Sequence, residues 1–415
     1  MFRSWNPDPA GDRRTSTRSV PALPRHRTTR EETTHDLSTH RDSPAVAGAR
    51  GCAQPDGARF GNIDHGRSIY FHAGLHADEH PGLLVLQHML EALHALDRDG
   101  RIEGCVTVVP FANPIGLSQR LFGPVVGRFD FENGENFNRN FPALGRAVAQ
   151  RLREDDASSL KRSEWKRFFR GLLDGGNAMS PAAAMKLELA RLAIEHDIVI
   201  DLHCDTDAIA HVYASTLQRE RAMKVAWWVD APVVLLEPAG AGGGAFDQSH
   251  SGAWGELQRA GLFDGEASGF SATIELRGQS DVNDALASTD ATRLLRFAES
   301  EGVLSFPDPF DDCAGLASPE AFPLEGAAHV RCPCAGVIVY RRAPGDRIAA
   351  GETFAEIVRL DGPEINSRVP VVSPIDGVMV VRQLQKLVRP GQRAALIAGD
   401  VPLVGRDPGN LLLDF

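Results

Sequence analysis

The stretch His76-Ala-Asp-Glu79-His80 contains the side chains in this sequence that are best suited to bind a metal and support catalysis. The spacing His76-x-x-Glu79 brings an imidazole and a carboxylate close enough to bind one Zn²⁺, if a third ligand arrives from elsewhere. His203 can supply that ligand, because it directly follows the strand-like run Asp197–Leu202. Two histidines and one acid with an open fourth position form a recurring catalytic zinc site. The metal in such a site lowers the pKa of its bound water from about 15.7 to about 7.

A second interpretation of the same stretch assigns the metal to His76 and His80. His-x-x-Glu-His is the inverzincin signature, in which both histidines bind the metal and the glutamate is the base. That geometry needs a continuous helix, so that the histidines share one face at i and i+4. Gly74 precedes the motif and Pro81 follows it directly, and proline disfavours helical geometry in the residue before it. We therefore expect a loop here, with His80 in a structural role.

Glu275 is the expected catalytic base. In the strand-like run around it, a period of two places Thr273, Glu275 and Arg277 on one face, and Ile274 and Leu276 on the other. The acid and the guanidinium could form only a strand-edge salt bridge. Next to a metal, however, a glutamate can take a proton from water and pass it to a leaving amine. We favour the catalytic role for Glu275 and interpret Arg277 as a candidate substrate contact.

Polar residues between the candidate strands could hold the substrate. Asn138 and Arg139 make a good carboxylate clamp, because arginine binds a carboxylate through two hydrogen bonds and the amide adds another donor. Arg128 is a candidate for stabilising the developing oxyanion.

The elements that must position these residues alternate between short apolar runs and helical patterns from about residue 66 to 305. Strands are predicted at 68–73, 105–111, 198–203, 233–236 and 271–276, and helices at 83–96, 180–196 and 217–229. This alternation is typical of an α/β sheet with helices on both faces. Sites in such sheets gather at the carboxyl ends of the strands, where His76 and His203 fall. The charged stretch 143–176 is interpreted as a solvated helical insertion.

The ends of the chain differ from this middle part. Residues 1–55 are polar and show no period, which predicts a disordered tail, and 56–305 form the predicted catalytic domain. A Pro-rich, acidic linker is expected at 306–330. Residues 331–415 are expected to form a small all-β domain that resembles a lipoyl-like barrel. Its expected hairpin, 359–365, contains no acceptor lysine, so no carrier function is predicted.

Composition excludes several classes of protein. The chain has 415 residues and a formal net charge of −11, which argues against nucleic acid as a partner. It contains no run of 18 or more apolar residues, so no membrane span is expected. Six cysteines in a chain this long do not make a disulfide framework, and a reducing cytoplasm fits them.

Several of these residues carry a resemblance to a known family. The ordered set is His76-x-x-Glu79, Asn113-Pro114, Asn138-Arg139, Asp201-Leu-His203 and Thr273-Ile-Glu275. It resembles the succinylglutamate desuccinylase/aspartoacylase family of zinc carboxypeptidase-like enzymes, over roughly residues 65 to 400. The resemblance implies a carboxypeptidase-like mixed sheet, one Zn²⁺ held by His76, Glu79 and His203, and Glu275 as base and then acid. It also implies Asn138 and Arg139 as the substrate clamp and Arg128 as the oxyanion residue.

The resulting hypothesis is a zinc-dependent hydrolase that cleaves the amide bond of an N-acyl amino acid or a related small carboxylate. One alternative is a metallocarboxypeptidase that trims peptide C-termini with the same metal set. Another is a non-enzymatic protein that uses a degenerate form of the fold. The sequence leaves open whether the chain forms a homo-oligomer.

Overall fold

The structure is a computed structural model that describes residues 55, 57–154, 156–238, 244–309, 316, 318–360 and 367–405. Apart from Pro55, the predicted N-terminal tail lies outside the described residues. Most of the predicted hairpin at 359–365 also lies outside them.

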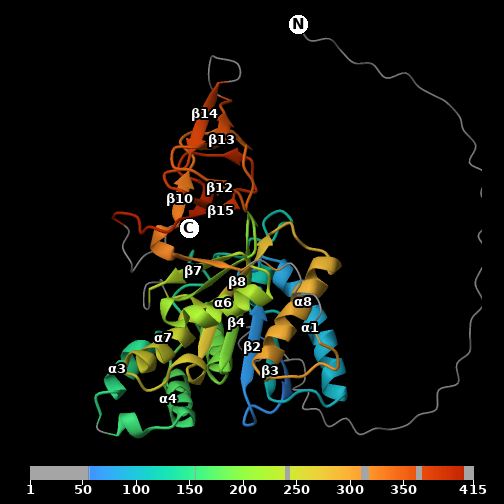
Figure 1. Ribbon diagram of the computed structural model, residues 1–415, viewed down its shortest axis with the longest axis vertical. Helices are drawn as coiled ribbons and strands as arrows, with labels where there is room; N and C mark the ends of the chain where they lie inside the picture. Colours follow the sequence, from blue (N-terminus) through green and yellow to red (C-terminus); the bar gives the residue numbers. More distant parts are fainter. Residues whose placement is uncertain are drawn as a thin grey trace, which may run out of the picture. The chain divides into compact units, whose positions relative to one another are not determined.

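An eight-stranded mixed sheet forms the centre of the first part of the chain, in the order β1-β3-β2-β4-β8-β6-β7-β9 (Figure 1). Its strands are β1 (Ala58–Gly61), β2 (Ser68–Ala73), β3 (Cys105–Val109), β4 (Ile198–Asp205), β6 (His211–Ser215), β7 (Val233–Glu237), β8 (Phe270–Gly278) and β9 (Glu320–Pro323). Strands β3, β2, β4 and β8 are parallel, whereas β6 runs antiparallel to β8. The predicted mixed α/β architecture is confirmed.

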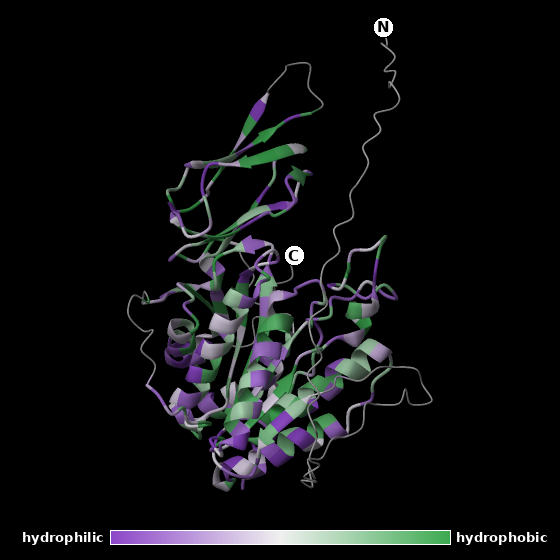
Figure 2. Cartoon of the chain, turned by 90° about the vertical axis from the view of Figure 1, so that its right-hand side faces the viewer, coloured by the Kyte–Doolittle hydropathy of each residue, from purple (hydrophilic) through white to green (hydrophobic). Residues whose placement is uncertain are grey.

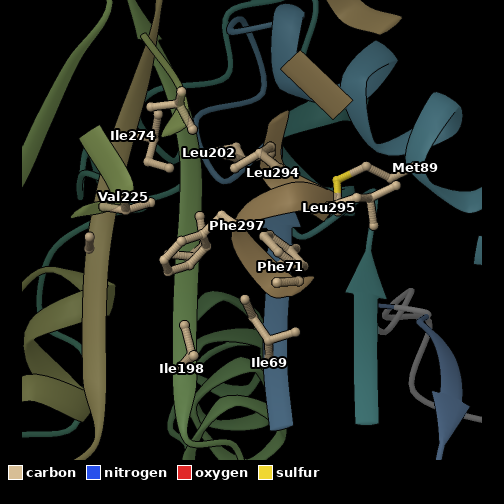
Figure 3. Close-up of a cluster of buried hydrophobic side chains, with 14 of the residues drawn as sticks. Ile69, Phe71, Met89, Ile198, Leu202, Val225, Ile274, Leu294, Leu295 and Phe297 are labelled. Atoms are coloured by element: carbon tan, nitrogen blue, oxygen red, sulfur yellow. The ribbon is translucent and has the colours of Figure 1, made fainter. Parts of the chain in front are cut away.

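Three helices cover one face of this sheet: α1 (Pro81–Arg98), α6 (Arg219–Trp228) and α8 (Asp284–Ser300). Their apolar side chains pack on alternate residues of the strands, as Figure 3 shows for Phe71, Leu202 and Ile274. These side chains are almost fully buried, and burial of each contributes about 1.5–3 kcal/mol.

The other face is covered by α5 (Pro181–Ile194) and α7 (Phe246–Arg259). Helix α5 begins as its sequence predicts, because the Ser180 hydroxyl accepts a hydrogen bond from the Ala183 N–H at 3.1 Å and Pro181 occupies the first turn. The helices around the central sheet carry both polar and apolar residues along their length (Figure 2). Of the helices that the structure describes, none is long and apolar enough to cross a membrane.

The stretch 143–176 is more buried than expected. It contains α3 (Gly145–Arg151) and α4 (Arg162–Asp174), and α4 buries Trp165, Phe169 and Leu173. The Phe169 ring meets the Trp254 ring of α7 edge-on at 5.4 Å. The interpretation as a solvated insertion was therefore wrong for α4, because its apolar residues recur every four positions and form a buried stripe.

The last part of the chain forms two antiparallel sheets, β10-β17-β15-β12 and β14-β13-β11-β16. Their strands are β10 (Ala328–Arg331), β11 (Gly336–Tyr340), β12 (Arg347–Ile348), β13 (Thr353–Val358), β14 (Arg368–Val372), β15 (Gly377–Arg382), β16 (Leu387–Val388) and β17 (Arg393–Ala398). Strand β15 also pairs with the short β5 (Asp207–Ala208), just beyond β4. The lipoyl-like character and the boundaries at 306–330 stay predictions, although β9, from that predicted linker, pairs with β7.

Candidate active site

Strand register assembles the site on the face of the sheet that α5 and α7 cover. His72 of β2 lies opposite Asp201 of β4, which lies opposite Thr273 of β8, and His203 lies opposite Glu275. Side chains two residues apart on a strand share one face, so the two histidines, the two acids and the threonine all point to the same side. The remaining candidates come from loops around this edge of the sheet.

His76, Glu79 and His203 meet at the carboxyl ends of β2 and β4. One donor atom from each lies within 4.8 Å of the others, and all three side chains are buried. The carboxylate of Glu79 lies between the two imidazoles: Oε1 is 3.0 Å from Nδ1 of His76, and Oε2 is 2.7 Å from Nδ1 of His203. Two imidazole nitrogens and one carboxylate oxygen are the donor set that Zn²⁺ accepts in catalytic sites.

The Nε2 atom of each imidazole, which faces away from Glu79, has its own partner. Nε2 of His76 lies 2.9 Å from Asn136 Oδ1, and Nε2 of His203 lies 3.0 Å from Asp201 Oδ2. Asp201 is in turn 2.7 Å from Nε2 of His72 through its Oδ1. Partners of this kind fix the tautomer and the orientation of a metal-binding histidine. They leave both Nδ1 atoms turned toward Glu79.

The charges of the metal-ligand candidates and of Asp201 stabilise one another. Burial disfavours a charged imidazole at His203, but Asp201 and Glu79 outweigh that effect and raise its pKa. Burial likewise disfavours the charged carboxylate of Glu79, but the two imidazoles outweigh it and lower its pKa well below the usual range. The three side chains therefore form a set that stabilises the ionised carboxylate needed for metal binding.

The loop between β2 and α1 has the form that the sequence predicts. Residues 76–80 are not helical, and α1 begins at Pro81 directly after them. His80 occupies the N-cap position and is exposed, so it does not share a helical face with His76. The inverzincin interpretation, with His76 and His80 as joint ligands, is thus excluded by the backbone.

Glu275 stands beside this group with a free carboxylate oxygen. Its Oε2 is buried and accepts no hydrogen bond from any described residue. Burial, followed by the negative charge of Glu79, raises the pKa of Glu275 to about 8. A buried oxygen without a partner is costly in a folded protein, and it indicates a position that a water molecule or a substrate can fill.

Arg128, Asn138 and Arg139 reach the same place from the segment between α2 (Pro114–Ser118) and α3. The Arg128 guanidinium donates to Glu79 Oε1 at 2.9 Å and lies 3.3 Å from His76 Nδ1. Asn138 Nδ2 lies 3.2 Å from His203 Nε2, and Asn138 Oδ1 accepts the N–H of Phe246 at 2.8 Å. Arg139 is half-buried, and its guanidinium donates to the Asn138 carbonyl at 2.6 Å.

A cavity of about 70 Å³ joins these residues. Most of the predicted site residues line it: His76, Arg128, Asn138, Arg139, His203 and Glu275. Further walls come from residues without a predicted role: Asp205, Tyr213, Glu237, Ala245, Asp247, Thr273 and Arg393. Arg393 belongs to β17 and forms an ion pair with Asp205, so the C-terminal sheets also contribute to the cavity.

Arg277 is not brought to the cavity. Its guanidinium forms an ion pair with Asp290 of α8, with Nη1 3.2 Å from Oδ1, and it is not among the described residues that line the cavity. Its backbone has a φ of 62°, which turns the chain out of the β conformation at the end of β8. A role for Arg277 in substrate binding stays a prediction.

Comparison with known proteins connects this geometry to a family. The model of the succinylglutamate desuccinylase/aspartoacylase catalytic domain matches residues 65–299. The chain belongs to this family. The matched range includes all the predicted metal ligands, Glu275 and the substrate clamp.

Individual family members have low sequence identity to this chain. The N-alpha-acetyl-L-2,4-diaminobutyric acid deacetylase of Halomonas elongata is 25% identical over 347 residues, covering 80% of this chain and 82% of that protein. A solved family protein from Shewanella amazonensis has a TM-score of 0.70 at 24% identity, over 82% of this chain and 93% of its own. The product-bound ectoine utilization protein EutE of Ruegeria pomeroyi has a TM-score of 0.56 at 16% identity, over 82% and 87%. These solved structures share the fold of this chain.

Some site residues of this family member were not found from its sequence. Asp201 was part of a sequence motif but had no predicted role, and His72 was not singled out. Both lie on predicted strands, two residues apart from His203 or opposite Asp201, so the strand pattern could have assigned them to the site. Asn136 is one residue from the Asn138-Arg139 pair, but only the folded loop brings it to His76. Arg393 gave no signal, since it is 190 residues beyond His203 and reaches the cavity through the packing of a different sheet.

Proposed function

We propose that this family member is a zinc-dependent amidohydrolase that cleaves an N-acyl amino acid or a related small carboxylate. One observation carries the proposal: two members of the buried donor set His76, Glu79 and His203, the histidines, line the same cavity as Glu275, whose Oε2 has no partner among the described residues. A donor set of this kind beside a carboxylate base is the arrangement that metal-assisted hydrolysis needs.

The three donors fit one Zn²⁺ per chain. They supply nitrogen and oxygen ligands of the right kind and number, and the partners of the Nε2 atoms leave Nδ1 of each imidazole directed toward Glu79, where a metal ion would bind. When bound, Zn²⁺ lowers the pKa of water and polarises a carbonyl group. Residues outside the donor set perform the remaining tasks.

Glu275 moves the proton. As the water oxygen attacks the carbonyl carbon of the amide, the proton of the water passes to the Glu275 carboxylate. When the carbon–nitrogen bond then breaks, Glu275 returns this proton to the departing amine nitrogen. The products are a carboxylic acid and a free amine, and Glu275 is restored to its starting state.

Arg128 and the pair Asn138-Arg139 hold the substrate. Arg128 places a half-buried guanidinium beside the donor set, where it can stabilise negative charge that develops on the carbonyl oxygen. Arg139 and the Asn138 amide can grip a carboxylate of the substrate from the cavity wall. Arg277, paired with Asp290, is kept as a weaker proposal for substrate contact.

The name of the Halomonas elongata relative supports an N-acyl amino acid over a peptide as the substrate, because that protein is a deacetylase of an acetylated amino acid. The carboxypeptidase alternative uses the same residues and differs only in what the cavity admits. The non-enzymatic alternative is disfavoured, because the donor set, the base and the candidate oxyanion residue are all present.

The test is a screen of zinc-loaded protein against N-acetyl and N-succinyl amino acids and against short peptides, with released amine as the readout. We expect hydrolysis of N-acyl amino acids, and none by the His203→Ala variant, which loses a ligand. Faster release of C-terminal residues from peptides would favour the carboxypeptidase alternative. No hydrolysis of either class would overturn the proposal.

A further inference from the structure

The cavity contains two acids that the proposed mechanism does not use, Glu237 and Asp247. Glu237 is the last residue of β7, and Asp247 lies in the first turn of α7. Both line the cavity beside Thr273 and Glu275, and they are 3% and 4% exposed. Burying two carboxylates at one wall of a cavity is unfavourable unless something compensates their charge.

Within the described part of the chain, this compensation is incomplete. Gln248 Nε2 donates to Glu237 Oε2 at 2.9 Å, and no described residue donates to Oε1. No hydrogen bond from a described side chain reaches the Asp247 carboxylate, which accepts hydrogen bonds from backbone N–H groups of its own turn. Neither acid forms an ion pair with a described lysine, arginine or histidine. Asp247 is thus a buried carboxylate at a cavity wall without a side-chain partner.

Two of the three arginines that line the cavity form ion pairs with other acids, and the third, Arg139, acts on Glu237 and Asp247 through its charge. Arg393 pairs with Asp205, and Arg128 pairs with Glu79. Burial, followed by the charge of Asp247, raises the pKa of Glu237 to about 8. Burial, followed by the charge of Asp201, raises the pKa of Asp247 to about 7. The charge of Arg139 acts on both acids but does not outweigh their burial, so a cationic ligand can provide further stabilisation of their charged forms.

We propose that Glu237 and Asp247 form a subsite for a cationic group of the substrate, so that the preferred substrates are N-acyl amino acids carrying a second, protonated amine. This inference rests on the proposed function and deepens it. Arg139 on the same cavity then binds the carboxylate, and the two acids bind the ammonium. The subsite thus selects an amino acid with both groups over one with an apolar side chain.

A purely structural role for the two acids is the alternative explanation. Glu237 and Asp247 both attract Arg139 electrostatically, so they could serve only to orient that guanidinium. In that case their removal would weaken binding of every substrate carboxylate equally. A cation subsite predicts a loss confined to substrates that carry the extra amine, so the charge of the substrate separates the two explanations.

The experiment compares Glu237→Gln and Asp247→Asn with the wild type and with the control Glu256→Gln. Glu256 lies on the same helix as Asp247 and pairs with Arg259 away from the cavity. The cationic substrates are the Nα-acetyl derivatives of 2,4-diaminobutyric acid, ornithine and lysine; the neutral ones are those of 2-aminobutyric acid, norvaline and norleucine. Calorimetric binding of free ornithine and norvaline to the zinc-loaded proteins gives a readout that does not depend on turnover.

We expect the wild type to prefer cationic over neutral substrates by at least about tenfold in kcat/KM. Each variant should lose about 10- to 100-fold on cationic substrates, as expected when a charged partner is removed, and remain near wild type on neutral ones. The control should match the wild type on both. Binding of ornithine, but not of norvaline, should weaken in the two variants.

Equal activity of the wild type on both sets, or an equal loss on both sets in the variants, would overturn the subsite. If one variant does not fold, the other variant still tests the subsite. The preference of the wild type for cationic over neutral substrates tests it without either variant. Ornithine binding without any hydrolysis would retain the subsite while refuting the proposed function. Hydrolysis without a preference for cationic substrates would refute the subsite while retaining the proposed function.

Discussion

The two faces of the central sheet are built from the same strands but serve different purposes. On the face covered by α1, α6 and α8, β2, β4 and β8 present Phe71, Leu202 and Ile274. On the opposite face the same strands present His72, His203 and Glu275. Neighbouring residues thus separate into a packing face and a chemical face, because side chains alternate along a strand.

This difference shows how the fold supports a buried polar site. The packing face is a continuous cluster of buried apolar side chains, and their burial contributes favourable free energy. It can therefore compensate the cost of burying histidines and acids on the other face, each of which needs a partner. We expect changes on the chemical face to alter activity and pH response, and changes on the packing face to alter stability alone.

The largest expected effect is that of Glu275→Gln on turnover. The amide cannot accept the proton of the attacking water, so kcat should fall by about 10²–10⁴-fold. The zinc content and the thermal midpoint should stay near wild type, because Glu275 is not in the donor set. Undiminished turnover in this variant would refute the base assignment.

The next effect concerns Asp201, which links His203 to His72. Asp201→Asn removes the charge that orients the imidazole, and loss of such a partner costs about 10–100-fold in metal affinity or activity. Zinc titration against a competing chelator measures this change. An unaltered zinc affinity would show that the imidazole is held by other contacts.

Acid should weaken the chemical side of the sheet first. His196 and His250 are buried there, and burial lowers the pKa of each to about 3. In the unfolded chain each titrates near pH 6.5, so the unfolded state binds protons first and stability is lost as the pH falls from about 6.5 toward 3. At pH 5 each histidine should cost about 2 kcal/mol relative to pH 7.5.

Urea unfolding at pH 7.5 and at pH 5 measures this loss, and His250→Gln serves as the matched variant. Its free energy of unfolding should fall by about 2 kcal/mol less than that of the wild type over the same interval. Identical pH dependence in both proteins would contradict a neutral, buried His250.

The smallest effect is expected for Ile274→Val, one residue from the catalytic candidate but on the packing face. Removal of one buried methylene should cost about 0.5–1.5 kcal/mol of stability and leave kcat within about twofold. Urea unfolding and a rate assay on the same preparation measure both quantities. A loss of activity similar to that of Glu275→Gln would mean that the two faces are not functionally separate.

Local patterns predicted much of this arrangement. The alternation in β8 predicted that Glu275 and Ile274 point to different faces of the sheet. Pro81 marked the start of α1, which left His76 and Glu79 in a loop. Helix α7 was missed because it follows a Gly-rich stretch and contains Gly252 and Gly255 among polar residues, so its apolar stripe is weak. Helix α8, with few large apolar residues in its first turns, was missed in the same way.

Contacts between distant segments could not be predicted in the same manner. The surroundings of Asp247, Arg393 and Asn136 depend on how α7, the C-terminal sheets and a long loop pack around one cavity. Nothing in the local sequence of β17 distinguishes Arg393 from a surface arginine. The ion pair that holds Arg277 to Asp290 likewise depends on the docking of α8.

Zinc content by elemental analysis of three purified proteins tests the central claim most directly. The account predicts one zinc per chain in the wild type and in Glu275→Gln, and almost none in His203→Ala. A wild type that binds no zinc after loading, or a His203→Ala variant that keeps a full equivalent, would contradict it.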